Sequence, residues 1–75
     1  MDINKFRKPS IAHKVDDKGD RFTIRPVSNS RVDVENFQVR AKEAENYVGC
    51  DFSSSAHKTS RFGVELIDMV MFSSK

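Results

Sequence analysis

Few side chains in this sequence could perform acid–base or metal chemistry, and they form no recognised spacing. Histidine occurs twice, at His13 and His57, and cysteine once, at Cys50. His13 alternates with Ile11 and Val15, as on the half-buried face of a strand, which favours a structural histidine over a catalytic one. The distance in sequence between Cys50 and His57 fits neither a zinc site nor a marked thiol–base pair. We therefore expect no catalytic residue, no metal and no cofactor.

The carboxylates and glycines do not form a ligand motif either. Acidic residues gather in a turn at 16–20 and on one helix face, positions where they usually serve solubility and capping. The turn lacks the alternating aspartates and glycine of a calcium loop. Each of the three glycines, Gly19, Gly49 and Gly63, is isolated, so no loop that could cradle a phosphate is present. The sequence thus predicts a protein that is not an enzyme.

The basic residues are the better lead to function. The chain has 13 lysines and arginines against 11 acids, a net charge of +2. The first 31 residues hold eight basic and four acidic side chains, and residues 32–75 hold five and seven. This asymmetry predicts an oriented electrostatic field. Cations interleaved with Phe6 and Phe22 are also typical of nucleic-acid binding, by phosphate contacts and base stacking.

One helix is predicted in the middle of the chain. Ser30 followed by Asp33 approximates a capping box, and Gly49 stands where a glycine would follow the last turn. A bulged strand over residues 32–41 is the competing interpretation, and the run of good helix formers at 41–45 favours the helix. The apolar stripe of this helix is Val34, Phe37, Ala41, Ala44 and Val48.

One hairpin is predicted before the helix and a second one after it. Residues 10–27 alternate around a turn at 16–20, where aspartates close local hydrogen bonds and Gly19 supplies a positive φ. After Cys50-Asp51-Phe52, which could start a strand, residues 53–60 are polar and resemble a loop. Residues 61–72 are apolar, with Phe62, Val64 and Leu66 in alternation. A short helix is the alternative for 64–72, but the valine, isoleucine and phenylalanine there favour a strand.

These elements predict an α+β fold of order β-β-α-β-β, with one helix packed on an antiparallel sheet. Residues 1–9 are expected to be a flexible basic arm, and residues 10–75 a single domain. A lone cysteine favours a reducing compartment. The N-terminus has no apolar core typical of a signal peptide, and 64–72 is too short to span a bilayer. We expect a cytoplasmic protein with no membrane partner.

The function that follows is a small non-catalytic binding protein, an inhibitor or adaptor that masks a protein partner. Such accessory inhibitors include proteins encoded by phages and mobile elements. The alternative is binding of single-stranded DNA or RNA through the basic arm and first hairpin. If the C-terminal strand is an outer strand, it could also pair with a second copy in a homodimer. The partner-binding residues that we predict are Phe6, Arg7, Lys8, Arg21, Arg25, Phe62, Met69, Met71 and Phe72.

Overall fold

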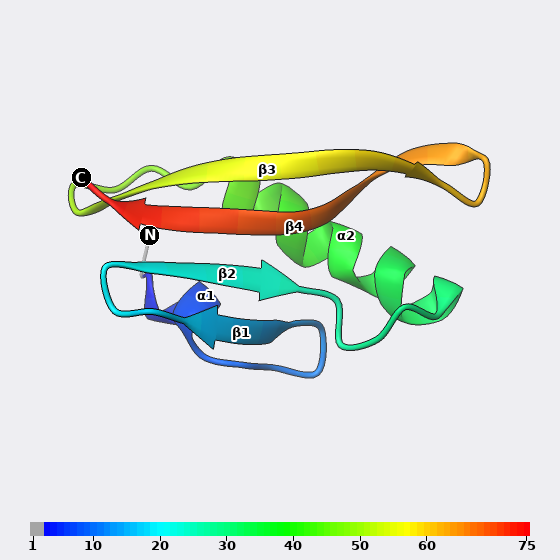
Figure 1. The fold of residues 1–75 in the computed structure, drawn as a ribbon, viewed down its shortest axis with the longest axis horizontal. Coiled ribbons are helices and arrows are strands. Elements are labelled where there is room, and N and C mark those ends of the chain that lie inside the picture. The colour runs from blue at the N-terminus through cyan, green and yellow to red at the C-terminus, as the bar shows by residue number, and fades with distance from the viewer. Residues whose placement is uncertain (1–2) are drawn as a thin grey trace.

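The computed structural model describes residues 3–75 and contains one antiparallel sheet with two helices on the same face (Figure 1). The strands lie in the order β1-β2-β4-β3, and each neighbouring pair is antiparallel. This confirms the predicted β-β-α-β-β order and α+β class, to which the structure adds a short N-terminal helix. The elements are α1 (Asn4–Arg7), β1 (Lys14–Asp17), β2 (Arg21–Arg25), α2 (Arg31–Glu45), β3 (Phe52–Arg61) and β4 (Val64–Ser74).

Helix α2 begins where the cap predicts it. The hydroxyl oxygen of Ser30 accepts a hydrogen bond from the backbone N–H of Asp33 at 3.3 Å, which satisfies one of the free donors of the first turn. Asp33 also places a negative charge near the positive end of the helix dipole. The helix then buries four residues of the predicted stripe against the sheet: Val34, Phe37, Ala41 and Ala44.

The predicted end of this helix is wrong. The helix stops at Glu45 with Asn46 as its C-cap, so Val48 lies outside it and is 82% exposed. Tyr47 takes the place of Val48 against the core, where its ring lies edge-on to Phe6 and Phe72. Gly49 is not a positive-φ cap residue. It is needed for space, because a Cβ at this position would collide with the Tyr47 ring.

The first hairpin confirms the predicted turn chemistry. Gly19 has a φ of 90°, and its N–H donates to the Asp17 carboxylate at 2.8 Å. The strands themselves are shorter than the alternation of residues 10–27 predicts. The strand β1 begins only at Lys14, so Ile11 lies in the preceding loop and is 99% exposed.

The second hairpin corrects two expectations. Residues 53–60, predicted as a loop, are most of strand β3, which pairs with β4 along its whole length. Phe62, predicted on a strand, lies instead in the connecting turn with Gly63, and their φ angles are 54° and 77°. Two residues of positive φ suit a tight hairpin whose twist matches its strands, and pairing with β4 holds the serines of β3 in the sheet.

Strand β4 is central, and it is a strand throughout rather than a helix. A bulge between His57 and Lys58 leaves Asp68 without a partner on β3 and reverses which side chains point inward. Beyond the end of β2, a side chain of α2 takes the place of a strand partner for the backbone of β4. The Gln38 side-chain amide donates to the carbonyl of Ile67 at 2.7 Å, and its oxygen accepts from the Ile67 N–H at 2.9 Å. Gln38 therefore anchors α2 on the sheet.

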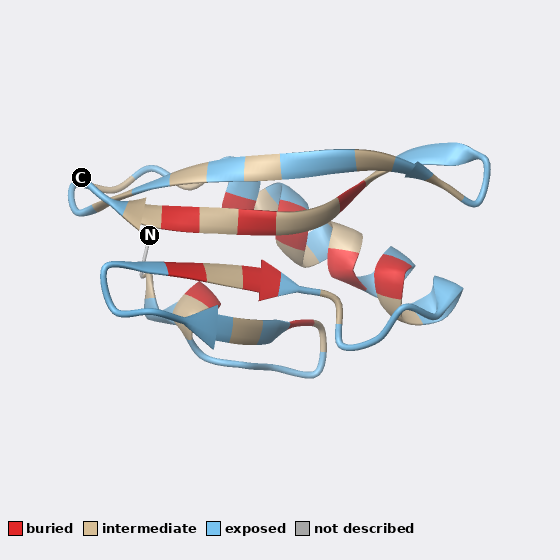
Figure 2. Cartoon of the chain, viewed as in Figure 1, coloured by how far each residue is buried: buried red, intermediate tan, exposed pale blue. Residues whose placement is uncertain are grey.

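The core lies between the sheet and the two helices, as the buried stripes of Figure 2 show. Helix α2 packs on β3 and β4, and α1 packs on β1 and β2. The aromatic rings of Phe22 and Phe72 stack with centroids 4.6 Å apart, and Phe6 from α1 stacks on Phe72 at 5.4 Å. Within residues 3–75, no helix is both long and apolar enough to cross a membrane.

The predicted arm over residues 1–9 needs correction in its described part. Met1 and Asp2 lie outside the described residues, but Asn4–Arg7 form α1, and the side chain of Phe6 is completely buried. The reason is hydrophobic: Phe6 completes the aromatic cluster that the sheet and α2 leave open on the β1–β2 side.

Candidate functional site: the uncovered face of the sheet

The face of the sheet that points away from α1 and α2 carries no covering element among the described residues, and it faces the viewer in Figure 1. Strand alternation decides which side chains reach it. Because Phe22 and Ile24 point into the core, their neighbours Arg21, Thr23 and Arg25 point outward. We call this surface the open face.

Two methionines form the apolar centre of the open face. Met69 and Met71 alternate with the buried Val70 on the central strand β4, and both are half-buried. Met71 lies between Thr23 of β2 and Ser55 of β3, its partners in the two strand pairings. Methionine side chains are flexible and polarisable, which suits contact with a surface of irregular shape.

Cations surround these methionines. Among residues 3–75, strand parity and the bulge bring two acidic side chains to this face: Asp16, whose carboxylate lies 3.6 Å from the Lys18 ammonium, and Asp68, whose carboxylate lies 2.6 Å from the His57 ring. Several cations on the helix side are paired, as in Lys5–Glu43 and Lys58–Glu45. By contrast, within residues 3–75 no ion pair is formed by Lys14, Arg21, Arg25 or Arg61.

At one end of the open face the cations border a hollow of about 280 Å³. Lys14 and Arg25 are directly opposite each other on β1 and β2, and Arg61 comes from the far end of β3. We call this the basic hollow, lined by Lys14, Arg25, Pro26, Asn29, Arg61 and Asp68.

The structure therefore brings together four of the predicted partner-binding residues. Arg21, Arg25, Met69 and Met71 come from the first hairpin and from the C-terminal strand, which were predicted as two separate surfaces. Because β2 and β4 are neighbours, these residues share one face. Pairing with a second copy was predicted on the condition that the C-terminal strand is an outer strand, and this condition is not met along Val70–Ser73, which pair with both β2 and β3.

Three other predicted residues make contacts within the fold instead. Phe6 and Phe72 are completely buried and cannot contact a partner. Arg7 is held by the Asp17 carboxylate, with Nε 2.9 Å from Oδ2, and its guanidinium lies 5.4 Å from the Phe22 ring centroid. The hydrogen bond from Arg7 lowers the pKa of Asp17, and the same bond raises the pKa of Arg7. Arg7 thus closes α1 onto the first hairpin.

The remaining two predicted residues lie away from the open face. Lys8 follows α1, is exposed, and gives its carbonyl to His13. Phe62 lies at the tip of the second hairpin and is 43% exposed, with the Arg31 guanidinium 5.8 Å from its ring centroid. Neither side chain is near the methionines in the strand register.

Sequence reasoning missed Lys14 and Arg61 as site residues. The signal for Lys14 was available, since it alternates with Val15, whose side chain packs against the core. Arg61 gave no such signal. The bulge opposite His57 and Lys58 changes the face of the sheet to which the following side chains point, and this bulge is not visible in the sequence pattern.

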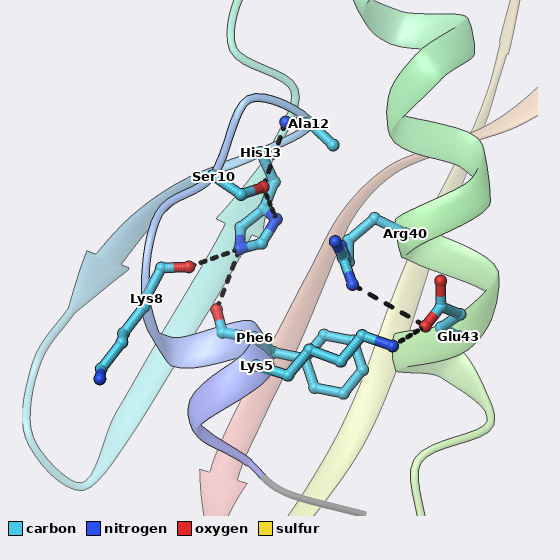
Figure 3. A network of polar contacts seen from close by, with 8 residues as sticks. All are labelled: Lys5, Phe6, Lys8, Ser10, Ala12, His13, Arg40 and Glu43. Carbon is cyan, nitrogen blue, oxygen red and sulfur yellow. Dashed lines mark hydrogen bonds and ion pairs between the residues drawn. The ribbon is translucent and has the colours of Figure 1, made fainter.

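His13 lies on the other side of the sheet, in a closed polar network (Figure 3). Its Nε2 is 2.9 Å from the carbonyl of Lys8 and 3.2 Å from that of Phe6, so this nitrogen carries the proton. Its Nδ1 faces the Ser10 hydroxyl at 3.0 Å. Burial lowers the pKa of His13, and the nearby Arg40 acts in the same direction. The neutral His13 thus holds together the segment that connects α1 to β1, through hydrogen bonds with Phe6, Lys8 and Ser10.

Residues 3–75 contain no group of three or more His, Cys, Asp or Glu side chains that could hold a metal ion. Cys50 is a free, exposed thiol. No family model, curated protein or solved structure matches the chain.

Proposed function

We propose that this chain is a non-catalytic binding protein, of the inhibitor or adaptor type, whose open face docks on an acidic surface of a protein partner. The observation that carries this proposal is the pair Met69 and Met71 among four cations that have no acidic partner in the described chain. Unpaired cations around an apolar centre are complementary to an acidic rim around an apolar patch.

The contacts of the two histidines favour a binding role over catalysis. The ring nitrogens of His13 are occupied by Lys8, Phe6 and Ser10, so none points into a cavity. His57 is exposed and bonded to Asp68. These contacts give a structural use to both histidines.

Nucleic acid is the rival partner, and the position of the aromatic rings weighs against it. Sequence-tolerant binding of single strands relies on rings that stack on bases. Here Phe22, Phe37 and Phe72 are buried, and Phe52 packs edge-on against Phe22 on the helix side. Phe62 is exposed, but it lies at the tip of the second hairpin, away from the methionines. The open face offers methionine, threonine and serine instead.

The test is affinity capture from nuclease-treated lysate of the native host with three immobilised proteins: wild type, Arg21→Glu/Arg25→Glu, and Lys42→Glu. Lys42 is an exposed cation on α2, on the opposite side of the sheet, and serves as the matched control. We expect a protein that wild type and Lys42→Glu retain, that the double variant binds at least about tenfold more weakly, and that elutes as salt rises.

Identical capture by all three proteins, or no capture by the wild type, would contradict the proposal. A parallel arm measures fluorescence anisotropy of labelled single-stranded DNA, duplex DNA and RNA at two salt concentrations. Tight binding that is lost at high salt and in Arg21→Glu/Arg25→Glu would show that the open face binds nucleic acid instead of a protein. The salt dependence is diagnostic because phosphate contacts release counterions.

A further inference from the structure

We propose that the basic hollow is a binding site for a phosphoryl group, either as free phosphate or as a phosphate monoester. The first reason is convergence. Lys14, Arg25 and Arg61 come from three different strands and line one hollow, although they are far apart in the sequence. Like charges that converge repel each other, and within residues 3–75 the one carboxylate of the lining, Asp68, forms its ion pair with His57 and not with these cations. An anion placed among them is therefore stabilised.

The chemistry of the lining groups selects an oxyanion. A guanidinium presents its N–H donors in a planar fork that matches two oxygens of a phosphate or carboxylate, and lysine adds a compact point charge. Arg25 and Arg61 supply two such forks, and the Asn29 side chain adds an amide with two more donors. Neither arginine makes an ion pair within residues 3–75 that would have to be broken first.

Charge and size then favour phosphate over a single carboxylate. Three cations and one carboxylate line the hollow, which leaves a net charge of +2. The carboxylate is that of Asp68, and its Oδ1 is already bonded to His57 at 2.6 Å. A phosphate monoester carries about −1.5 to −2 charges at pH 7, close to the charge that the lining leaves open. A volume of about 280 Å³ is at the small end of ligand pockets, which suits a group of a few atoms.

This site goes beyond the proposed protein partner and does not depend on it. The phosphoryl group is recognised by side chains of one chain, so phosphate alone is a sufficient probe. If the capture experiment fails and phosphate still binds, the hollow is a small-anion site in its own right. If phosphate fails and capture succeeds, the open face holds its partner without an oxyanion anchor.

The experiment is an NMR titration of the ¹⁵N-labelled chain that follows the backbone amides and the arginine Nε–H groups. Inorganic phosphate, O-phosphoserine and serine are added at constant ionic strength, with sodium chloride as the balancing salt. We expect saturable shifts confined to Arg25, Arg61, Asn29 and Lys14 with the two phosphorylated probes. Serine should give none, and O-phosphoserine against inorganic phosphate separates the monoester from the free ion.

Variants decide whether the hollow is the site. Arg25→Gln/Arg61→Gln should weaken phosphate binding at least about tenfold, since charge-assisted hydrogen bonds are lost. The matched control is Arg21→Gln, which removes an equally unpaired arginine from the same strand and face but outside the hollow. All three side chains lie at the surface and not in the core, and the spectra themselves report folding. Linear shifts equal to those of chloride, or equal losses in both variants, would overturn the proposal.

Discussion

At the scale of single residues, His13 is the side chain with the clearest consequence for stability. It is completely buried, and both of its ring nitrogens are hydrogen-bonded in the neutral form. Burial penalises the charged imidazolium, which lowers its pKa in the folded chain. The unfolded chain titrates at the usual value of about 6.5, so it binds more protons than the folded chain just below that pH.

The contribution of His13 to the free energy of unfolding should therefore be constant above pH 7 and fall as the pH drops from about 6.5 towards 5. Urea denaturation at pH 7.5 and at pH 5.5 measures this difference. The carboxyls whose pKa is lowered, Asp17 and Glu43, lose their stabilising effect only below about pH 4.5, outside this window. His13→Gln should lower stability at pH 7.5 and remove most of the difference between the two pH values.

The control is Ile11→Ala, which changes an exposed side chain that precedes His13 and carries no titratable group. This variant should keep the wild-type difference between pH 7.5 and pH 5.5. An unchanged difference in His13→Gln would mean that another group titrates in this range.

At the scale of elements, the contact between α2 and β4 depends on Gln38. Its amide pairs with both backbone groups of Ile67, where β2 has ended and the strand would otherwise leave them open. Gln38→Leu keeps the apolar contact but leaves a buried donor and acceptor without partners. We expect a loss of about 1–3 kcal/mol in the free energy of unfolding, measured by urea denaturation.

Asn36→Leu is the matched change, because Asn36 is an exposed amide on the same helix. It should alter the free energy of unfolding by no more than about 0.5 kcal/mol. Equal stability of the two variants would show that Gln38 is not the anchor.

The elements also show what the sequence could predict. The helix and the first hairpin follow from local signals, namely the Ser30 cap, the apolar stripe and the Asp17–Gly19 turn. Strand β3 gives no local signal, because its serines become a strand only by pairing with β4. The bulge at Asp68 and the Gln38–Ile67 contact join residues far apart in sequence, so no periodicity reveals them.

The same limit applies to the candidate site. Composition pointed to Arg21, Arg25, Met69 and Met71, but only the order β2-β4 in the sheet makes them neighbours. Phe6 shows the reverse error. Its basic surroundings in the sequence suggested a contact residue on an arm, whereas its apolar ring is more stable in the core.

At the scale of the whole molecule, α1 completes the core. Phe6→Ala should destabilise the chain by about 3–5 kcal/mol, because it removes a fully buried ring from the aromatic cluster. If that variant does not fold, Phe6→Leu gives a smaller loss, because it keeps more of the buried side chain, and this loss can still be measured by thermal denaturation.

Ile11→Ala removes a large apolar side chain from the same part of the chain, but that side chain is 99% exposed. It should leave the melting temperature unchanged. If Phe6→Ala behaved like Ile11→Ala, residues 3–9 would be an arm after all.

The molecule as a whole is electrically two-sided. On the helix side, cations meet acids in pairs such as Lys5–Glu43 and Lys58–Glu45. On the open face, four cations are left without such pairs within residues 3–75. A field with this orientation speeds the encounter with an acidic surface and turns the open face towards it.

The last residues of the chain lie at the opposite end of the sheet from the basic hollow. The N–H of Ser74 donates to the carbonyl of Asp20 at 2.8 Å, beside the turn of the first hairpin, whereas Arg25 ends β2 at the hollow. A tether attached after Lys75 would hold the molecule by that far end. Chains fixed to a sensor surface in this way would all present the hollow to the solution, so binding could be measured on oriented molecules without removing the tether.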